Sequence, residues 1–104
     1  MVPTRAQIQA MADRLAAEFA VDRVVLFGSH ARGQAGPDSD IDLLVVHRFV
    51  GSRIDEAARM RARLDSTLSI DLVLRRPEEL DPSRSDFLSS LALREGQTLY
   101  DRAA

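Results

Sequence analysis

The chain has 104 residues and a net charge of −2, and 45% of its residues are hydrophobic and 29% are charged. This composition is ordinary for a globular protein, and no apolar run is long enough to span a bilayer. The absence of cysteine and of an N-terminal apolar segment gives no sign of export, so we expect a cytoplasmic protein. The small negative charge also provides no attraction to polymeric DNA or RNA. We therefore expect one domain over residues 1–104 that binds neither a membrane nor a nucleic acid polymer.

The first half of the chain is predicted to alternate between helix and strand. Thr4 and Gln7 form a capping box ahead of apolar residues at helical spacing, which predicts an amphipathic helix over residues 4–19. An apolar run at residues 24–27 predicts a short buried strand that ends at a glycine. The residues after this glycine are expected to open a helix, and the apolar residues 41–46 then predict a second strand.

The middle of the chain continues this alternation. Gly51 and Ser52 are expected to open a second long helix, because serine is a favoured cap at a helix N-terminus. The apolar side of this helix is expected to consist of Ile54, Ala57, Ala58 and Leu64. An apolar stretch at residues 69–74 then predicts a third strand, which contains one acidic residue.

The last third of the chain predicts one more helix and an extended tail. Asp81 and Pro82 are expected to cap a helix over residues 83–94, and Gly96 is placed to end it. The apolar stripe of this helix is expected to be core, with a partner interface as the alternative, and consists of Phe87, Leu88 and Leu91. This order of elements predicts an α/β (α+β) domain with one small mixed β-sheet packed with helices.

Two aspartates lie at the start of the predicted second strand. Because side chains alternate along a strand, Asp40 and Asp42 project from one face while Ile41 and Leu43 point into the core. Two carboxylates this close repel each other unless a divalent cation accepts both as oxygen ligands. The pair therefore implies Mg²⁺, whereas the neighbouring Asp38 is expected to be a turn residue.

The segment after the first strand has the composition of a phosphate-binding turn. Gly28 lets the backbone approach a ligand closely, and Ser29 adds a hydroxyl donor. Gly28 as a plain strand terminator and Ser29 as a helix cap are both compatible with phosphate binding. Arg32 supplies a positive charge that contacts either a phosphate or an acid such as Asp38 or Asp40, and the sequence leaves both choices open.

The arrangement of Gly28-Ser29, a short spacer and Asp40-Ile41-Asp42 resembles the nucleotidyltransferase superfamily that includes DNA polymerase β. The form Gly-Ser-x-Ala-Arg-Gly and the small size are most similar to the minimal nucleotidyltransferases, or MNT proteins. That family carries a third carboxylate on a later strand, and Asp71 stands at the matching place. The alternative interpretation of Asp71 is a solvated position at a sheet edge.

The resemblance implies a polymerase β-like fold and a reaction with ATP. The three aspartates would bind two Mg²⁺ ions and catalyse nucleotidyl transfer, while Gly28, Ser29 and Arg32 would bind the nucleotide. MNT proteins of this kind are commonly the antitoxins of helical HEPN ribonuclease toxins and transfer AMP to a toxin tyrosine. The resemblance therefore implies a HEPN-type toxin as partner, in a hetero-oligomer.

Two other functions are consistent with the same residues. The protein neutralises its partner by binding alone, with a vestigial nucleotide site, or it is a stand-alone nucleotidyltransferase that acts on a small molecule. Replacing Asp40 and Asp42 by asparagine separates catalysis from binding, because binding alone survives that change in a folded protein.

Overall fold

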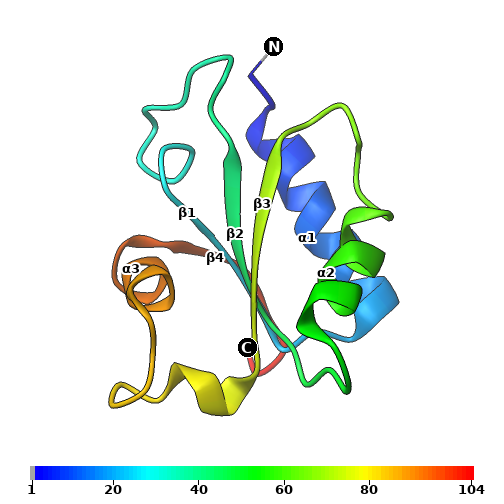
Figure 1. Cartoon of the computed structure of the whole chain (residues 1–104). Coiled ribbons are helices and arrows are strands. Elements are labelled where there is room, and N and C mark those ends of the chain that lie inside the picture. Colours follow the sequence, from blue (N-terminus) through cyan, green and yellow to red (C-terminus); the bar gives the residue numbers. More distant parts are fainter. Residues whose placement is uncertain (1) are drawn as a thin grey trace.

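A computed structural model of the chain describes residues 2–104 (Figure 1). In chain order the elements are α1 (Arg5–Phe19), β1 (Arg23–Phe27), β2 (Ile41–Val46), α2 (Arg53–Arg61), β3 (Ile70–Arg75), the 3₁₀ helix η1 (Pro77–Leu80), α3 (Phe87–Glu95) and β4 (Gln97–Asp101). The strands form one sheet in the order β3-β2-β1-β4. β2 and β3 run parallel, while β1 runs antiparallel to both β2 and β4. The predicted small mixed sheet packed with helices is therefore confirmed.

The two faces of the sheet carry different helices, with α1 and α2 on one side and α3 on the other (Figure 1). Because successive side chains of a strand point to opposite faces, Leu43 of β2 joins the core under α1 and α2, and Leu44 joins the core under α3. Asp42 lies on the same face of β2 as Leu44. This alternation places the carboxylate on the side of the sheet that carries α3.

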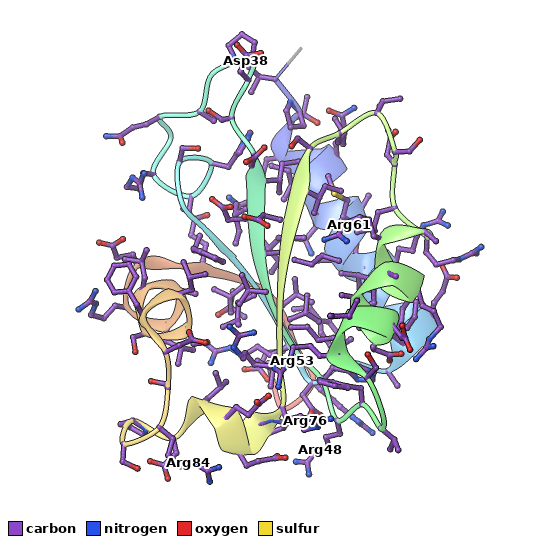
Figure 2. All side chains as sticks on the ribbon, viewed as in Figure 1. Asp38, Arg48, Arg53, Arg61, Arg76 and Arg84 are labelled. Atoms are coloured by element: carbon purple, nitrogen blue, oxygen red, sulfur yellow. The ribbon has the colours of Figure 1, made fainter. Side chains whose placement is uncertain are left out.

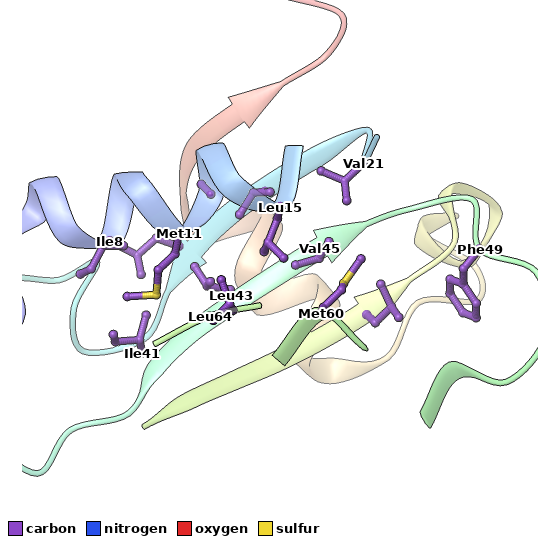
Figure 3. Close-up of a cluster of buried hydrophobic side chains, with 14 residues drawn as sticks. Ile8, Met11, Leu15, Val21, Ile41, Leu43, Val45, Phe49, Met60 and Leu64 are labelled. Carbon is purple, nitrogen blue, oxygen red and sulfur yellow. The ribbon is translucent and has the colours of Figure 1, made fainter. Parts of the chain in front are cut away.

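The larger core lies between the sheet and helices α1 and α2 (Figure 3). Met11 and Leu15 of α1 pack there with Leu43 and Val45 of β2 and Met60 of α2. Leu15, Leu43 and Met60 are fully buried. Each such side chain contributes about 1.5–3 kcal/mol through removal of its apolar surface from water. This core therefore holds β2 in place from the side opposite Asp42.

Several predicted element boundaries are confirmed. Thr4 caps α1, and its side chain and that of Gln7 form the predicted capping box. β2 has the predicted limits, and the Ser52 side chain accepts a hydrogen bond from the Asp55 amide at the start of α2. Gly96 follows the last residue of α3. None of the helices within residues 2–104 is long and apolar enough to cross a membrane.

The prediction of a helix between the first two strands is wrong. The segment after β1 instead forms hydrogen-bonded turns, in which the carbonyl oxygen of Gly28 accepts from the amides of Ala31 and Arg32. Gly33 follows with a φ of +70°, a conformation that ends a right-handed helical turn. Gly36 and Pro37 come next and do not favour a helix. The loop between β1 and β2 is therefore built from turns.

The buried side of α2 also differs from the prediction. Glu56 and Met60 are the buried residues within this helix, whereas Ile54 is 80% exposed. Glu56 accepts hydrogen bonds from His47 and from Arg59. Because these donors satisfy its carboxylate, the helix can turn a charged residue inward and leave Ile54 in solvent.

α3 starts four residues later than the predicted limit of residue 83. Its N-cap is Asp86, whose side chain accepts from the Ser89 amide and also pairs with Arg75. Asp81 instead forms a separate turn with the residues that follow it. The helix begins at Phe87 and buries Ser89 and Ala92. Of the stripe predicted as core, Leu91 packs against the core under α3, whereas Phe87 is 73% and Leu88 is 45% exposed.

Candidate active site

Asp42 and Asp71 are directly paired on adjacent strands. In the parallel ladder of β2 and β3, Asp42 is the register partner of Asp71. Register partners of neighbouring strands project their side chains from the same face of the sheet. Asp42 is half-buried and Asp71 is exposed. The two carboxylates thus form an acidic pair that is accessible from solvent.

Gly28 lies against the Asp42 carboxylate. The strand pairing of β1 and β2 sets Phe27, the last residue of β1, opposite Asp42, and Gly28 follows directly. A Cβ built at Gly28 overlaps Oδ2 of Asp42 and stands 3.1 Å from its Cγ. Gly28 also has a φ of +77°, which a residue with a side chain adopts only under strain. Glycine is therefore required here by both space and backbone conformation.

The electrostatic surroundings of Asp42 show that like charges gather around it. Burial raises the pKa of Asp42, and the negative charges of Asp71 and Asp40 raise it further. His30 and Arg32 act in the opposite direction. The pKa is nevertheless raised overall, so the positive groups of the turn do not compensate for burial and repulsion. The arrangement favours a bound cation.

Asp40 lies beside this pair and is held by a hydrogen bond. Its Oδ1 accepts from the hydroxyl of Ser69, the residue that directly precedes β3. The amide of Ile41 donates to the carbonyl oxygen of Ser69 at 2.8 Å, which fixes the two strand starts together. Asp38 lies farther out, at the tip of the loop in Figure 2. The structure thus places Asp40 next to the acidic pair and Asp38 away from it.

Arg32 and Ser29 lie on the turn that follows Gly28. Ser29 is half-buried, and its carbonyl oxygen accepts from the Gln34 amide at 2.9 Å. Arg32 is exposed, and its Nε donates to the Gln34 side chain at 3.2 Å. Among residues 2–104, Arg32 forms no ion pair with Asp38 or Asp40. Its guanidinium therefore remains available to a phosphate.

The acidic side chains of the site supply part of the ligands that a divalent cation needs. Within residues 2–104, no three acidic or histidine side chains are gathered into a group that could hold a metal ion by itself. Magnesium, however, is usually bound by one or two carboxylates together with substrate phosphates and water. The adjacent carboxylates of Asp42 and Asp71 match that mode of binding. The residues therefore fit Mg²⁺ that arrives with a phosphorylated substrate.

Sequence reasoning missed two residues at this site. Ser69 orients Asp40, and its position directly before the strand of Asp71 was the available signal. Gln97 of β4 donates from its side chain to the Ala31 carbonyl oxygen at 2.6 Å and so ties the turn to the sheet. No sequence pattern indicates this contact, because 66 residues separate its partners.

Comparisons with known proteins identify the family and the fold of the chain. A sequence model of the nucleotidyltransferase domain family matches residues 8–94, which include the turn and all three aspartates. No curated protein matches the chain significantly.

Three solved structures share the fold. A toxin–antitoxin crystallised with AMP-PNP has a TM-score of 0.64 and 22% identity, over 89% of this chain and 73% of that one. A proposed nucleotidyltransferase from Sulfolobus solfataricus has a TM-score of 0.65 and 20% identity, over 94% and 80%. The toxin–antitoxin MntA–HpeT, in a variant with two aspartates changed to glutamate, has a TM-score of 0.61 and 19% identity, over 89% and 72%. With the family model spanning most of its length, the chain belongs to the nucleotidyltransferase domain family.

Proposed function

We propose that this protein is a minimal nucleotidyltransferase that transfers AMP from ATP to a tyrosine of a HEPN-type ribonuclease toxin and so acts as its antitoxin in the cytoplasm. The observation that carries the proposal is the register pairing of Asp42 with Asp71, with Gly28 pressed against the Asp42 carboxylate. Nucleotidyl transfer needs carboxylates beside a turn that admits a triphosphate. The site offers both on one solvent-accessible face.

In the proposed reaction, the acceptor hydroxyl oxygen forms a bond to the α-phosphorus of ATP, and the bond from that phosphorus to the pyrophosphate oxygen breaks. Asp71 is exposed beside Asp42 and takes the hydroxyl proton. Ser29 and Arg32 donate to the phosphate oxygens and orient the triphosphate. Asp40, Asp42 and Asp71 would hold two Mg²⁺ ions, which supply charge stabilisation to the attacking and the leaving oxygen.

The proposal of a toxin as partner is supported by solved structures with the same fold and by the resemblance of the sequence motifs. Two structures with the same fold are described as toxin–antitoxins, and one of them was crystallised with AMP-PNP. An ATP analogue in that complex is compatible with ATP as the nucleotide here. The HEPN class of the toxin and its tyrosine acceptor follow from the resemblance of the Gly-Ser and Asp-x-Asp motifs to MNT proteins.

A second candidate function is neutralisation of the toxin by binding alone. Two observations favour it: Asp40 is engaged by Ser69, and residues 2–104 contain no ready-made group of three metal ligands. In that case the acidic pair is a remnant, and the nucleotide has no role. The two functions differ in whether the partner becomes covalently modified.

The test is intact-mass analysis of both chains after incubation with Mg²⁺ and ATP, with and without a co-expressed HEPN partner. The variant expected to lose AMP transfer is Asp42→Asn. The matched control is Asp38→Asn, which removes one negative charge from the loop tip. An AMP adduct on the partner with the wild type and Asp38→Asn, but not with Asp42→Asn, supports the transferase. A tight complex without an adduct supports binding alone, and AMP on an added small alcohol without any partner supports the stand-alone enzyme.

A further inference from the structure

A second pocket lies at the opposite end of the sheet from the acidic pair. It is open to solvent, has a volume of about 430 Å³ and is lined by the start of β1, the end of β2, η1 and the segment around the end of β4. Figure 1 shows η1 and the C-terminus at this end of the molecule, and the loop between β1 and β2 at the other. The pocket therefore lies outside the proposed active site. Its volume is within the usual range for small-molecule sites, about 300–1,000 Å³.

The pocket has an apolar part. Val46 at the end of β2 is 4% exposed, and Pro77 and Leu80 of η1 are half-buried beside it. Ala103 adds a further apolar side chain. A surface of this kind favours the hydrocarbon portion of a ligand over a bare inorganic ion.

The rest of the lining carries three arginines and two aspartates. Asp22 pairs with two of these arginines at once, with Arg48 at 3.3 Å and Arg102 at 3.6 Å. Asp101 uses its Oδ1 to accept from the Ala103 amide at 2.9 Å. The guanidinium groups of Arg48 and Arg102 are largely exposed and share one carboxylate, so both keep free donors.

Of the three arginines of the pocket, Arg23 is the one with a buried hydrogen-bond donor that lacks a partner among residues 2–104. Its Nη2 donates to the Thr98 hydroxyl at 3.1 Å. Its Nε is buried and has no hydrogen-bond partner in the part of the chain that the structure describes. Arg23 also forms no ion pair with any of residues 2–104. A buried donor without a partner is unfavourable, so Arg23 gains from an anion that its guanidinium group can reach.

We propose that this pocket binds a small organic acid, with its carboxylate between Arg23 and Arg48 and its apolar body on Val46 and Leu80. The excess of arginine over aspartate selects an anion, and the planar guanidinium groups match the geometry of a carboxylate. The apolar side of the pocket selects an acid with a hydrocarbon body. The site is independent of the proposed nucleotidyl transfer, because the acidic pair lies at the other end of β2.

The experiment is a titration of the ¹⁵N-labelled protein with benzoate, followed by NMR of the backbone amides and of the arginine Nε–H groups. Benzamide, which has the same shape without the charge, is the matched ligand. We expect saturable shifts at Arg23 Nε, Val46 and Leu80, with a dissociation constant on the order of 1 mM. We expect binding of benzamide to be about tenfold weaker or undetectable.

Substitutions of single arginines test which of them bind the carboxylate of benzoate. Arg23→Gln is expected to weaken benzoate binding by about tenfold, and Arg48→Gln by about threefold, because its side chain is 75% exposed. Arg61→Gln removes an exposed arginine of α2, outside the pocket, and is expected to leave binding unchanged. Because Arg48 and Arg61 are both exposed, these two variants remain informative even if Arg23→Gln does not fold.

The proposal is overturned by shifts that do not saturate, by equal binding of benzoate and benzamide, or by equal weakening by Arg48→Gln and Arg61→Gln. The last result indicates general attraction of an anion to surface arginines. A wild-type spectrum that is unchanged by benzoate overturns it as well.

Discussion

At one end of the sheet Asp42 and Asp71 hold two negative charges side by side, whereas at the other end Arg53 and Glu79 pair opposite charges through two hydrogen bonds of 2.9 and 2.6 Å. The first arrangement raises the pKa of Asp42, through burial and then through repulsion by Asp71. The second lowers the pKa of Glu79 to about 2, chiefly through its hydrogen bonds with Arg53. The two ends of the sheet therefore carry an unfavourable and a favourable charge arrangement.

The favourable end extends beyond this one ion pair. The guanidinium carbons of Arg76 and Arg53 lie 3.9 and 5.5 Å from the ring centre of the buried Phe49. Figure 2 shows Arg53 and Arg76 together at this end. Cation–π contacts of this kind add about 0.5–1 kcal/mol each at exposed sites. The comparison indicates that this end stabilises the fold, whereas burial and repulsion disfavour the charge of Asp42 at the acidic end, a cost that the proposed ligand binding would offset.

The largest expected effect comes from Gly28→Ala, which breaks the acidic end. The new methyl group overlaps Oδ2 of Asp42, and the φ of +77° adds about 1–2 kcal/mol of backbone strain. We expect a loss of about 2–4 kcal/mol of unfolding free energy, because the carboxylate must move. The displaced carboxylate is expected to lower AMP transfer about 100-fold. Urea unfolding and the intact-mass assay measure the two effects.

Gly33→Ala is the matched control for this change. Gly33 has a similar φ of +70°, but nothing lies within 4 Å of a Cβ built there. It should show the backbone strain alone, with a smaller loss of stability and nearly normal transfer. Equal effects of the two substitutions would mean that contact with Asp42 is not the reason for glycine at position 28.

The next largest effect is expected from Glu56→Gln at the favourable end. Burial raises the pKa of Glu56, but hydrogen bonds from Arg59 and His47 lower it by more, so the pKa lies below its usual value. Replacing the carboxylate weakens both charge-assisted bonds and is expected to cost about 1–2 kcal/mol of unfolding free energy. Glu95→Gln, at an exposed position, is the control. A cost no larger than that of the control would contradict a stabilising role for this carboxylate.

Glu79→Gln is expected to have a smaller effect, about 1 kcal/mol at neutral pH, because Arg53 is partly exposed and water screens the pair. The pKa of Glu79 lies at about 2 and its ordinary value is 4.5, so the unfolded chain binds the proton more readily. The contribution of Glu79 is therefore complete above about pH 4.5 and is lost as the pH falls toward 2.

Urea unfolding between pH 7 and pH 3 measures this dependence. The difference in stability between the wild type and Glu79→Gln should shrink as the pH is lowered. The neighbouring Glu78 is exposed, and Glu78→Gln serves as the control. A difference that stays constant down to the lowest pH would show that Glu79 does not act through its charge.

Local signals predicted much of the fold. Thr4 and Gln7 indicated the start of α1, and the apolar run of β2 indicated its limits, because a capping box and a buried strand depend on neighbouring residues alone. The predicted start of α3 was wrong because Asp86, which also accepts a hydrogen bond from Arg75 eleven residues away, caps the helix. The sequence had instead indicated a cap at Asp81, which is followed by a proline.

Part of the candidate site could likewise be predicted from local motifs, and the rest depends on contacts between distant parts of the sequence. The Asp-x-Asp pattern and the Gly28-Ser29 turn are visible in the sequence as short motifs, and both lie at the acidic end. The proximity of Asp71 to Asp42 depends on strand order, which no local pattern specifies, and it was inferred only from resemblance to a family. The Ser69 hydrogen bond to Asp40 depends on the same long-range pairing.

The smallest expected change, and the one of opposite sign, is that of Asp42→Asn. Without Mg²⁺, this substitution removes a charge that burial and Asp71 disfavour, so we expect unfolding free energy to rise by about 0.5 kcal/mol at neutral pH. Addition of Mg²⁺ and a non-hydrolysable ATP analogue should then stabilise the wild type and Asp38→Asn, but not Asp42→Asn, because a ligand stabilises only the form that binds it. Thermal unfolding with the ligands and with EDTA measures this reversal. If Asp42→Asn is less stable than the wild type in EDTA, the acidic end does not sacrifice stability for binding, and the contrast between the two ends of the sheet fails.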